Sequence, residues 1–163
     1  MPHDTLSTLA TLAGSRLKER GFMLATAESC TGGWVAQAVT AIAGSSEWFD
    51  CGFVTYSNSA KEDLLGVPRV TLRQHGAVSE ETAAAMVLGA LERSRAQVGV
   101  AVTGIAGPGG GSAERPVGTV CFAWGRRDGP VRTARILFQG DRHEVREQTI
   151  LAALQGVLDL VGL

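Results

Sequence analysis

Three hydroxyl-bearing side chains and one lysine follow the ends of apolar segments, and these residues are best suited to chemistry. They are Ser29, Tyr56, Lys61 and Thr103. A serine oxygen attacks a carbonyl carbon once a base removes its proton, and a lysine whose pKa is lowered by burial can be that base. Lys61 also stands near the start of an expected helix, where the helix dipole disfavours the ammonium form. These residue types indicate nucleophilic catalysis by Ser29 with Lys61 as its base.

Each of these residues also fits a simpler role. Ser29 suits the N-cap of the helix that follows it, and an isolated lysine such as Lys61 is most often exposed to solvent. Cys30 is a competing nucleophile, although small buried cysteines more often serve packing. Two serine hydrolase motifs are absent, because Ala27 stands at a required glycine of Gly-x-Ser-x-Gly and Asn58 at the required serine of Ser-x-x-Lys. Position alone leaves these alternatives open.

Other kinds of reactive centre have weaker support in the sequence. A Ser-His-Asp triad is not favoured, because all three histidines stand in polar contexts typical of solvated side chains: His3, His75 and His143. The three cysteines lack the short Cys-x-x-Cys spacing of a zinc site, and their odd number does not indicate a disulfide framework. We therefore expect no metal and no cofactor.

A glycine-rich segment at 103–111 resembles loops that hold phosphate through backbone N–H groups. It is not a Walker A loop, because Gly110 occupies the position of the lysine. In the turn after Ser29, the unpaired N–H groups at the start of the next helix can hold a developing oxyanion. Small residues in both places allow a substrate to approach the backbone. The expected substrate contacts there are Thr31, Gly32, Gly104 and Gly107.

The composition is that of an ordinary globular domain. The chain has 163 residues, of which 45% are hydrophobic and 19% charged, with 15 Lys and Arg against 16 Asp and Glu. A net charge of −1 gives no general attraction to nucleic acid, and no apolar run approaches the roughly 18 residues that span a bilayer. We expect one domain over residues 1–163, a cytoplasmic location, and neither nucleic acid nor membrane as a partner.

Helical and strand patterns alternate along the chain. Expected helices cover about 4–20, 33–43, 60–65, 80–95 and a final segment capped by Asp141. Expected strands cover about 22–27, 51–56, 98–102, 118–124 and 131–138. Alternation of this kind is typical of parallel strands, whereas the turn at 125–129 joins the last two strands as a hairpin. The sequence predicts an α/β fold with three α/β/α layers, whose mixed, mostly parallel five-stranded sheet has one antiparallel strand.

The expected sheet gathers the reactive residues at one edge. Ligands of open α/β sheets bind outside the carboxyl ends of the parallel strands, where loops and helix N-termini meet. Ser29, Lys61 and Thr103 all follow such ends. If the fifth strand runs parallel to the first three, Arg142 joins the same edge. We therefore expect a nucleophile, an amine, several hydroxyls and a guanidinium to face one cleft.

Several segments of the chain closely resemble the CinA C-terminal family. The resemblance rests on Thr-Ala-Glu-Ser-Cys-Thr-Gly-Gly at 26–33, Tyr-Ser-Asn at 56–58 with Lys61, Leu-Leu-Gly-Val at 64–67, Gly-Ala-Val-Ser at 76–79, Thr-Gly-Ile-Ala-Gly-Pro at 103–108 and Pro-Val-Gly at 116–118. It extends over nearly the whole chain. Because several long motifs occur in the right order, the resemblance is highly specific.

The family includes stand-alone nicotinamide-nucleotide amidohydrolases. The resemblance implies hydrolysis of the carboxamide of nicotinamide mononucleotide to nicotinate mononucleotide and ammonia, within pyridine-nucleotide recycling. It further implies that Ser29 is the nucleophile and Lys61 the general base. Their hydrogen-bonding partners would be Tyr56 and Thr103, with Arg142 as a polar contact in the site. A small-molecule nucleotide substrate and a homo-oligomer are also implied.

Two positions depart from the family pattern. Cys51 stands where a glycine is usual, and Arg115 replaces a lysine before the Pro-Val-Gly segment. Neither change removes a proposed catalytic group. Since some relatives are associated with competence and DNA damage, the alternative is a non-catalytic nucleotide-binding or regulatory module. A DNA-binding role has little support from the net charge.

Overall fold

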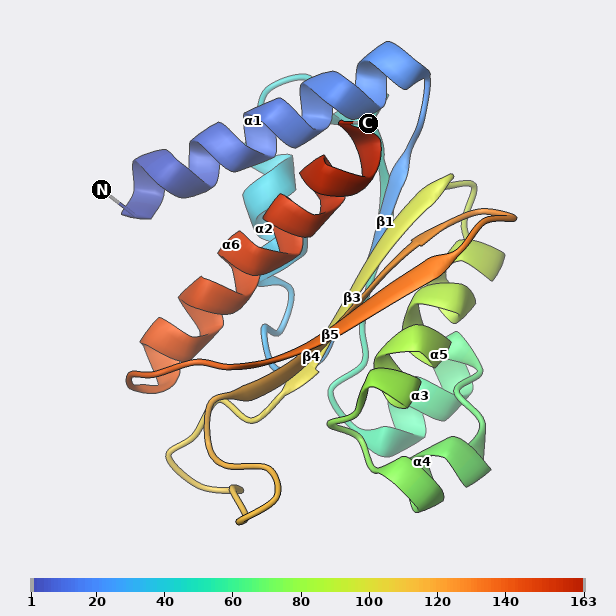
Figure 1. Cartoon of the computed structure of the whole chain (residues 1–163). Helices are drawn as coiled ribbons and strands as arrows, with labels where there is room; N and C mark the ends of the chain where they lie inside the picture. The colour runs from blue at the N-terminus through green and yellow to red at the C-terminus, as the bar shows by residue number, and fades with distance from the viewer. Residues whose placement is uncertain (1, 163) are drawn as a thin grey trace.

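The computed structural model describes residues 2–162, with side chains from Thr5 onward. Five strands form one sheet between two layers of helices (Figure 1). The helices are α1 (Pro2–Arg20), α2 (Trp34–Thr40), α3 (Asn58–Leu65), α4 (Arg69–His75), α5 (Glu80–Glu92) and α6 (Arg142–Val161), with a short 3-10 helix η1 (Ser45–Glu47). The strands are β1 (Leu24–Glu28), β2 (Phe49–Val54), β3 (Val98–Gly104), β4 (Thr119–Arg126) and β5 (Val131–Leu137).

The strand order is β2-β1-β3-β4-β5. β1 pairs in parallel with β2 and β3, whereas β4 is antiparallel to both β3 and β5. β5 therefore runs in the same direction as the first three strands, and β4 is the one antiparallel strand. The predicted α/β class and sheet are confirmed. The carboxyl ends of β1, β2, β3 and β5 lie at one edge of the sheet, where the site residues were expected.

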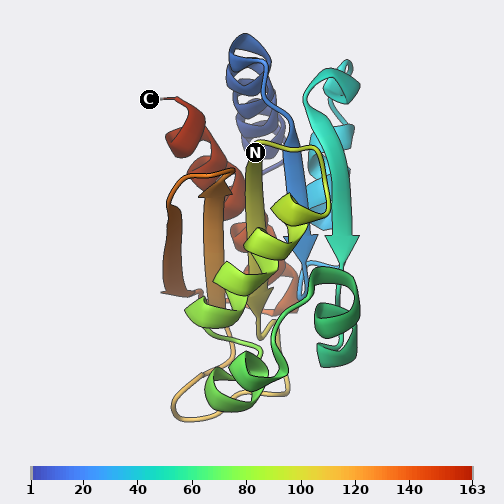
Figure 2. The ribbon, with the colours of Figure 1, turned by 90° about the vertical axis from the view of Figure 1, so that its right-hand side faces the viewer.

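The helices divide between the two faces of the sheet. α1, α2 and α6 cover one face, and α3, α4 and α5 cover the other, so that α5 lies in front of the sheet in Figure 2. Each face has its own buried core. The turns at the carboxyl edge therefore lead into helices of both layers: β1 into α2, and β2 into α3.

Local signals explain where the helices near the site begin and end. The Ser57 hydroxyl accepts from the backbone N–H of Ala60 and caps α3, which ends at Gly66 with a φ of 67°. Asp141 and Glu144 form a reciprocal capping box at the start of α6. These caps fix the first turns of the two helices that carry Lys61 and Arg142.

Some boundaries differ from the sequence-based expectation. α1 begins at Pro2 rather than near residue 4, since proline is favoured in the first turn of a helix. α2 ends at Thr40, before the expected 43. α4 was not predicted, because a seven-residue helix directly after Pro68 is too short to show a period. None of these differences changes the order of the strands.

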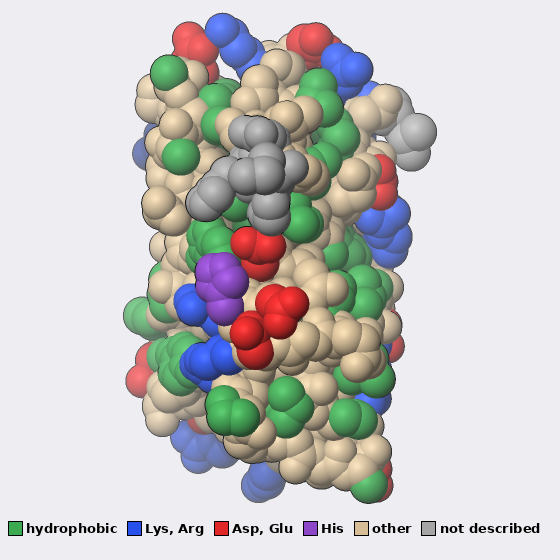
Figure 3. Space-filling model, turned by 90° about the vertical axis from the view of Figure 1, so that its left-hand side faces the viewer, with side chains coloured by type: hydrophobic (Ala, Val, Ile, Leu, Met, Phe, Trp, Pro, Cys, Tyr) green, Lys and Arg blue, Asp and Glu red, His purple; other side chains and the backbone are tan. Residues whose placement is uncertain are grey.

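Charges of both signs are mixed on the face that Figure 3 shows, the left-hand face of Figure 1. A histidine lies close to basic and acidic side chains there, and the described part of this face carries no continuous basic stripe. Within residues 2–162, no helix has the length and apolar content needed to cross a bilayer.

Candidate active site

Ser29 lies in a tight turn between β1 and α2. Its backbone N–H donates to the Val102 carbonyl of β3 at 3.1 Å, which extends the pairing of the two strands by one residue. Gly32 and Gly33 then adopt φ values of 60° and 106°, a region that residues with a Cβ rarely enter. The glycines let the chain reverse into α2 directly after the serine. The Ser29 side chain is 7% exposed.

Lys61 reaches Ser29 from the other layer of helices. Its Nζ lies 3.0 Å from the Ser29 Oγ and donates to the backbone carbonyls of Thr55 at 2.9 Å and Tyr56 at 3.3 Å. The expectation that Ser29 and Lys61 meet is confirmed by this distance. Since the two residues are 32 positions apart, only the parallel pairing of β1 and β2 brings them together.

The amine of Lys61 is buried. Its side chain is 1% exposed, and no Asp or Glu of residues 5–162 forms an ion pair with it. Burial lowers the pKa of Lys61 below its ordinary value, because a charged ammonium is costly away from water; the nearby Cys30 has a smaller opposing effect. The site therefore favours a neutral amine beside the serine oxygen.

A cavity of about 200 Å³ opens beside this pair. Its lining is Ser29, Cys30, Tyr56, Asn58, Lys61, Ala77, Val78, Thr103, Gly104, Ala106 and Arg142. The Thr103 hydroxyl donates to the Ala77 carbonyl at 2.8 Å, which fixes the threonine at the wall. Six of the nine predicted catalytic and substrate-binding residues line this cavity: Ser29, Lys61, Tyr56, Thr103, Gly104 and Arg142.

Tyr56 and Arg142 meet at the mouth of the cavity. The Tyr56 side chain is 63% exposed, and its hydroxyl accepts from the Arg142 guanidinium at 3.3 Å. Arg142 also donates to the Gly107 carbonyl at 2.7 Å. Gly107 does not line the cavity itself, and its expected contact with substrate stays a prediction. Three loops are thus joined around one guanidinium.

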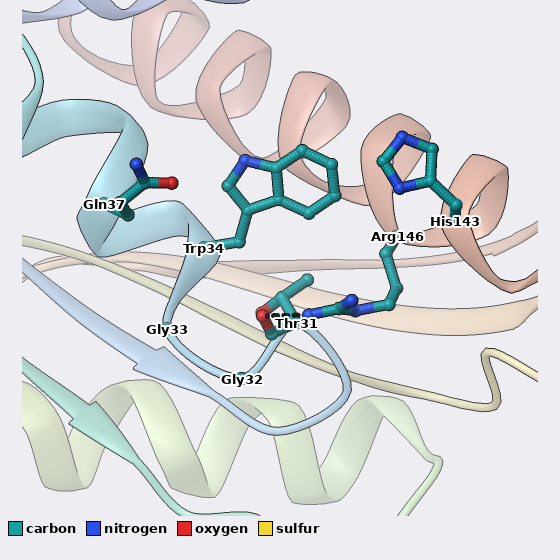
Figure 4. A pocket seen from close by; sticks show the side chains of 7 residues that line it. All are labelled: Thr31, Gly32, Gly33, Trp34, Gln37, His143 and Arg146. Atoms are coloured by element: carbon teal, nitrogen blue, oxygen red, sulfur yellow. Dashed lines mark hydrogen bonds between the residues drawn. The ribbon is translucent and has the colours of Figure 1, made fainter.

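Thr31 and Gly32 do not share the Ser29 cavity. They line a separate, open pocket of about 450 Å³ with Trp34, His143 and Arg146 (Figure 4). The Thr31 hydroxyl is buried and donates to a carboxylate oxygen of Glu28 at 2.5 Å. The turn therefore directs Thr31 and Gly32 away from the Ser29 cavity, and their expected contact with substrate stays a prediction.

The N–H groups of α2 are also occupied. Those of Gly33, Val35 and Ala36 donate to the Glu28 carboxylate at 3.2, 2.9 and 3.0 Å. They are not free to hold an oxyanion, contrary to expectation. In the described residues, the N–H groups of Cys30 and Thr31 donate to no backbone carbonyl, which leaves them as candidates.

The competing reactive groups are poorly placed. Burial raises the pKa of the Cys30 thiol to about 12, so the reactive thiolate is disfavoured. His75 lies beside Glu81, and His143 lies beside Glu147 and the Trp34 ring; neither lines the Ser29 cavity. The side chain of His3 lies outside the described residues. In the described part of the chain, no three His, Cys, Asp or Glu side chains are grouped as a metal site.

Sequence reasoning missed Glu28 and Arg146. Arg146 donates to the carbonyls of Cys30 and Thr31 at 3.2 and 3.0 Å, from 115 or more positions along the chain. The signal for Glu28 was an acidic residue at the end of a buried strand, directly before a turn into a helix. Arg146 gave no comparable signal, because only packing of α6 brings it to the turn.

Comparison with known proteins identifies the family. The family description "CinA C-terminal domain" matches residues 6–161. The chain belongs to the CinA C-terminal domain family. Among CinA relatives, the nicotinamide-nucleotide amidohydrolase PncC of Enterobacter agglomerans is 54% identical over 158 residues, covering 97% of this chain and 96% of that protein. PncC of Escherichia coli K12 is also 54% identical, over 95% of this chain and 94% of that protein.

Solved structures of CinA proteins have the same fold. The competence/damage inducible protein CihA of Agrobacterium tumefaciens superposes with a TM-score of 0.94 at 49% sequence identity. The match covers 98% of this chain and 96% of that one. The structural likeness therefore extends over the whole CinA domain, including the edge that carries the Ser29 cavity.

Proposed function

We propose that the chain is a nicotinamide-nucleotide amidohydrolase that cleaves the carboxamide of nicotinamide mononucleotide, with Ser29 as nucleophile and Lys61 as general base. The observation that carries this proposal is the buried Lys61 amine, which lies 3.0 Å from the Ser29 oxygen and pairs with no carboxylate among the described side chains. Burying a charged lysine without a counter-ion costs free energy, so such a lysine favours its neutral form. A neutral amine is the base that a serine nucleophile needs. The names of the near full-length CinA relatives supply the substrate.

The first half of the reaction is acyl transfer to Ser29. Neutral Lys61 takes the hydroxyl proton as the serine oxygen attacks the amide carbon, and the carbonyl oxygen becomes an oxyanion. The backbone N–H groups of Cys30 and Thr31 are the candidate donors to that oxyanion. The Lys61 ammonium then gives its proton to the departing nitrogen, the C–N bond breaks, and ammonia leaves an ester on Ser29.

The second half repeats the proton transfers with water. Lys61, neutral again, takes a proton from a water molecule as the water oxygen attacks the ester carbon. The proton returns to the Ser29 oxygen when the ester bond breaks, and the product carboxylate is released. Thr103 and Tyr56 are proposed hydrogen-bonding partners, because both line the cavity in which the amide must lie.

The two cavities at this edge fit the two ends of the substrate. The small cavity beside Ser29 takes the nicotinamide ring, with Gly104 at its wall. A neighbouring cavity of about 590 Å³ shares Ala106 and Arg142 with it and offers room for the ribose phosphate. Arg142 stands between the two, where its guanidinium can bind phosphate oxygens. The reaction would serve pyridine-nucleotide recycling.

Ammonia release from nicotinamide mononucleotide by the purified chain tests the proposal. We expect turnover by the natural sequence and none by Ser29→Ala, which should remain folded because it loses one partly buried hydroxyl. The non-catalytic alternative predicts calorimetric binding of the nucleotide without ammonia. Full activity of a folded Ser29→Ala variant would contradict the serine mechanism and direct attention to Cys30.

A further inference from the structure

The turn that carries Ser29 is held from two sides by ionisable side chains that do not line the Ser29 cavity. Glu28 lies on one side and Arg146 on the other. The carboxylate takes hydrogen-bond donors of the turn and of α2, whereas the guanidinium takes carbonyl acceptors of the same turn. Their contacts are therefore complementary and leave the serine side chain free.

Glu28 makes an unusually complete set of contacts for a buried carboxylate. Its side chain is 1% exposed, and one oxygen accepts from the Thr31 hydroxyl and from the N–H groups of Gly33 and Val35. The other oxygen accepts from the N–H of Ala36 at 3.0 Å. A buried charge is tolerated only when it is well hydrogen-bonded, so these four donors and the carboxylate depend on one another.

Arg146 closes the turn from the side of α6. Its Nε donates to the Cys30 carbonyl at 3.2 Å and its Nη2 donates to the Thr31 carbonyl at 3.0 Å. Figure 4 shows the guanidinium pointing toward Thr31, next to the Trp34 side chain. The guanidinium carbon lies 5.6 Å from the centre of the Trp34 ring, a cation–π distance that further restrains it.

We propose that Glu28 and Arg146 are positioning residues for Ser29. Glu28 directly precedes the serine, and its four contacts set the path of the turn, which Arg146 fixes through the two carbonyls that follow the serine. Lys61 is held by the carbonyls of Thr55 and Tyr56, and neither residue bonds to the side chain of Glu28 or Arg146. We call the hydrogen bonds that each of these two side chains makes to the turn a clamp. Loss of either clamp should move the Ser29 oxygen away from Lys61, whose position stays fixed. This inference rests on the proposed amide hydrolysis.

The decisive variant is Glu28→Gln. Glutamine has the same length, but its NH₂ group faces the N–H donor of Ala36 and the negative charge is lost. We expect kcat to fall about tenfold to a hundredfold, since misplacement of a reacting group by about 1 Å can cost a factor of that size. KM and the pH at half-maximal activity should stay unchanged, because the Glu28 side chain bonds to Thr31, Gly33, Val35 and Ala36, which do not line the cavity, and not to Lys61. A residue that itself moved protons would change the pH profile.

A matched control separates positioning from general destabilisation. Trp124→Phe removes another buried hydrogen bond, from the indole Nε1 to the Ala153 carbonyl at 2.9 Å, in a part of the core away from the Ser29 cavity. At temperatures where both variants are folded, Trp124→Phe should keep the natural kcat. Equal losses of kcat in the two variants would mean that Glu28 acts only through stability and would overturn the proposal.

Two further measurements keep the test decisive. If Glu28→Gln does not fold, Arg146→Met tests the other clamp at a partly exposed position. An unchanged kcat in Arg146→Met overturns the proposal. A reduced kcat that recovers in part in Arg146→Lys supports it. If the natural chain releases no ammonia, the proposed function fails. The effect of Glu28 on the position of Ser29 is then measured in a crystal structure of Glu28→Gln. An unchanged 3.0 Å distance between Ser29 Oγ and Lys61 Nζ would overturn it, and a displaced Ser29 would support it.

Discussion

The two faces of the sheet are packed in opposite ways. Under α1, α2 and α6, the central strands β3 and β4 present large side chains: Val98, Val100, Val102, Val120, Phe122 and Trp124. Toward α5, the same strands present small residues: Gly99, Ala101, Cys121, Ala123 and Gly125. Because side chains alternate along a strand, one sequence with alternating size builds both faces.

Each layer has a helix glycine in close contact with a neighbouring element, but the group that contacts the glycine differs. On the large-residue face, the Trp124 ring lies against Gly156 of α6, where an added Cβ would be 2.1 Å from the ring. On the small-residue face, the Leu65 carbonyl of α3 lies against Gly89 of α5, 1.9 Å from where a Cβ would be. A side chain can move a little, but a backbone carbonyl moves only with its helix. Changes on the small-residue face should therefore reach the helix that carries Lys61.

The largest expected effect tests whether the two layers act as one unit. Ser29 comes from the turn into α2 and Lys61 from α3, so removal of either should stop the same step. We expect Lys61→Ala to lower kcat about 10²–10⁴-fold, the usual contribution of a general base. The Ser29→Ala and Lys61→Ala double variant should be no slower than Ser29→Ala alone, as single-turnover rates would show. A double variant whose rate falls by the product of the two single-variant losses would contradict a shared step.

The pH dependence sharpens the comparison of the two faces, because burial of Lys61 on the small-residue face lowers the pKa of its amine. The neutral amine is the active form, so kcat/KM should rise with pH to a plateau, with a midpoint below the ordinary lysine value of 10.5. The rise should be about tenfold per pH unit below the midpoint. A rate that is flat from neutral to alkaline pH would argue against a titrating base.

The same pKa shift predicts a trend in stability. Since the unfolded chain holds the Lys61 proton more tightly than the folded chain, the free energy of unfolding should rise with pH from the lowered pKa up to 10.5. Urea denaturation at several pH values would measure the trend. Lys61→Met should remove the part of the slope that belongs to this residue.

A matched pair of glycine substitutions compares the two faces directly. Gly89→Ala and Gly156→Ala both place a methyl group inside a helix, and overpacking of this kind costs about 1–3 kcal/mol. Both should lower the denaturation midpoint, but only Gly89→Ala should lower kcat, by displacing α3 and Lys61. Loss of kcat in Gly156→Ala at a temperature where it is folded would contradict the difference between the faces.

The smallest expected effect is on the large-residue face. Ile150 of α6 is fully buried in the core on this face, and Ile150→Val removes one methylene group. We expect a loss of about 0.5–1.5 kcal/mol in the free energy of unfolding, with kcat unchanged. Chemical denaturation and steady-state kinetics on the same sample would check both. A marked fall in kcat would show that this face also controls the site.

Much of the fold could be predicted because its signals are local. Apolar periods located the five strands along the chain, and the short turn at 125–129 made β4 the antiparallel strand once β5 was parallel to β3. The order of the strands across the sheet was not predicted. α4 was not predicted, since its seven residues are too few to show a helical period. The early end of α2 depends on the chain path through η1, which no local pattern specified.

The site could be predicted in part for the same reason. Ser29, Lys61 and Thr103 follow strand ends, and parallel strands bring their ends to one edge. Thr31 and Gly32 were expected beside Ser29 but line another pocket, because the direction of each residue in the turn depends on positive φ values and on the buried carboxylate of Glu28. Arg146 could not be placed, since its contacts lie more than 100 positions away along the chain.

The sequence by itself determined which groups are available at the carboxyl edge, because strand and helix periods are properties of neighbouring residues. Only the tertiary structure decided that Lys61 is buried, pairs with no carboxylate in the described part of the chain and lies 3.0 Å from Ser29, and that Glu28 occupies the donors of α2. Burial and the absence of a counter-ion are set by every element packed around a group. They cannot be read from its own place in the chain.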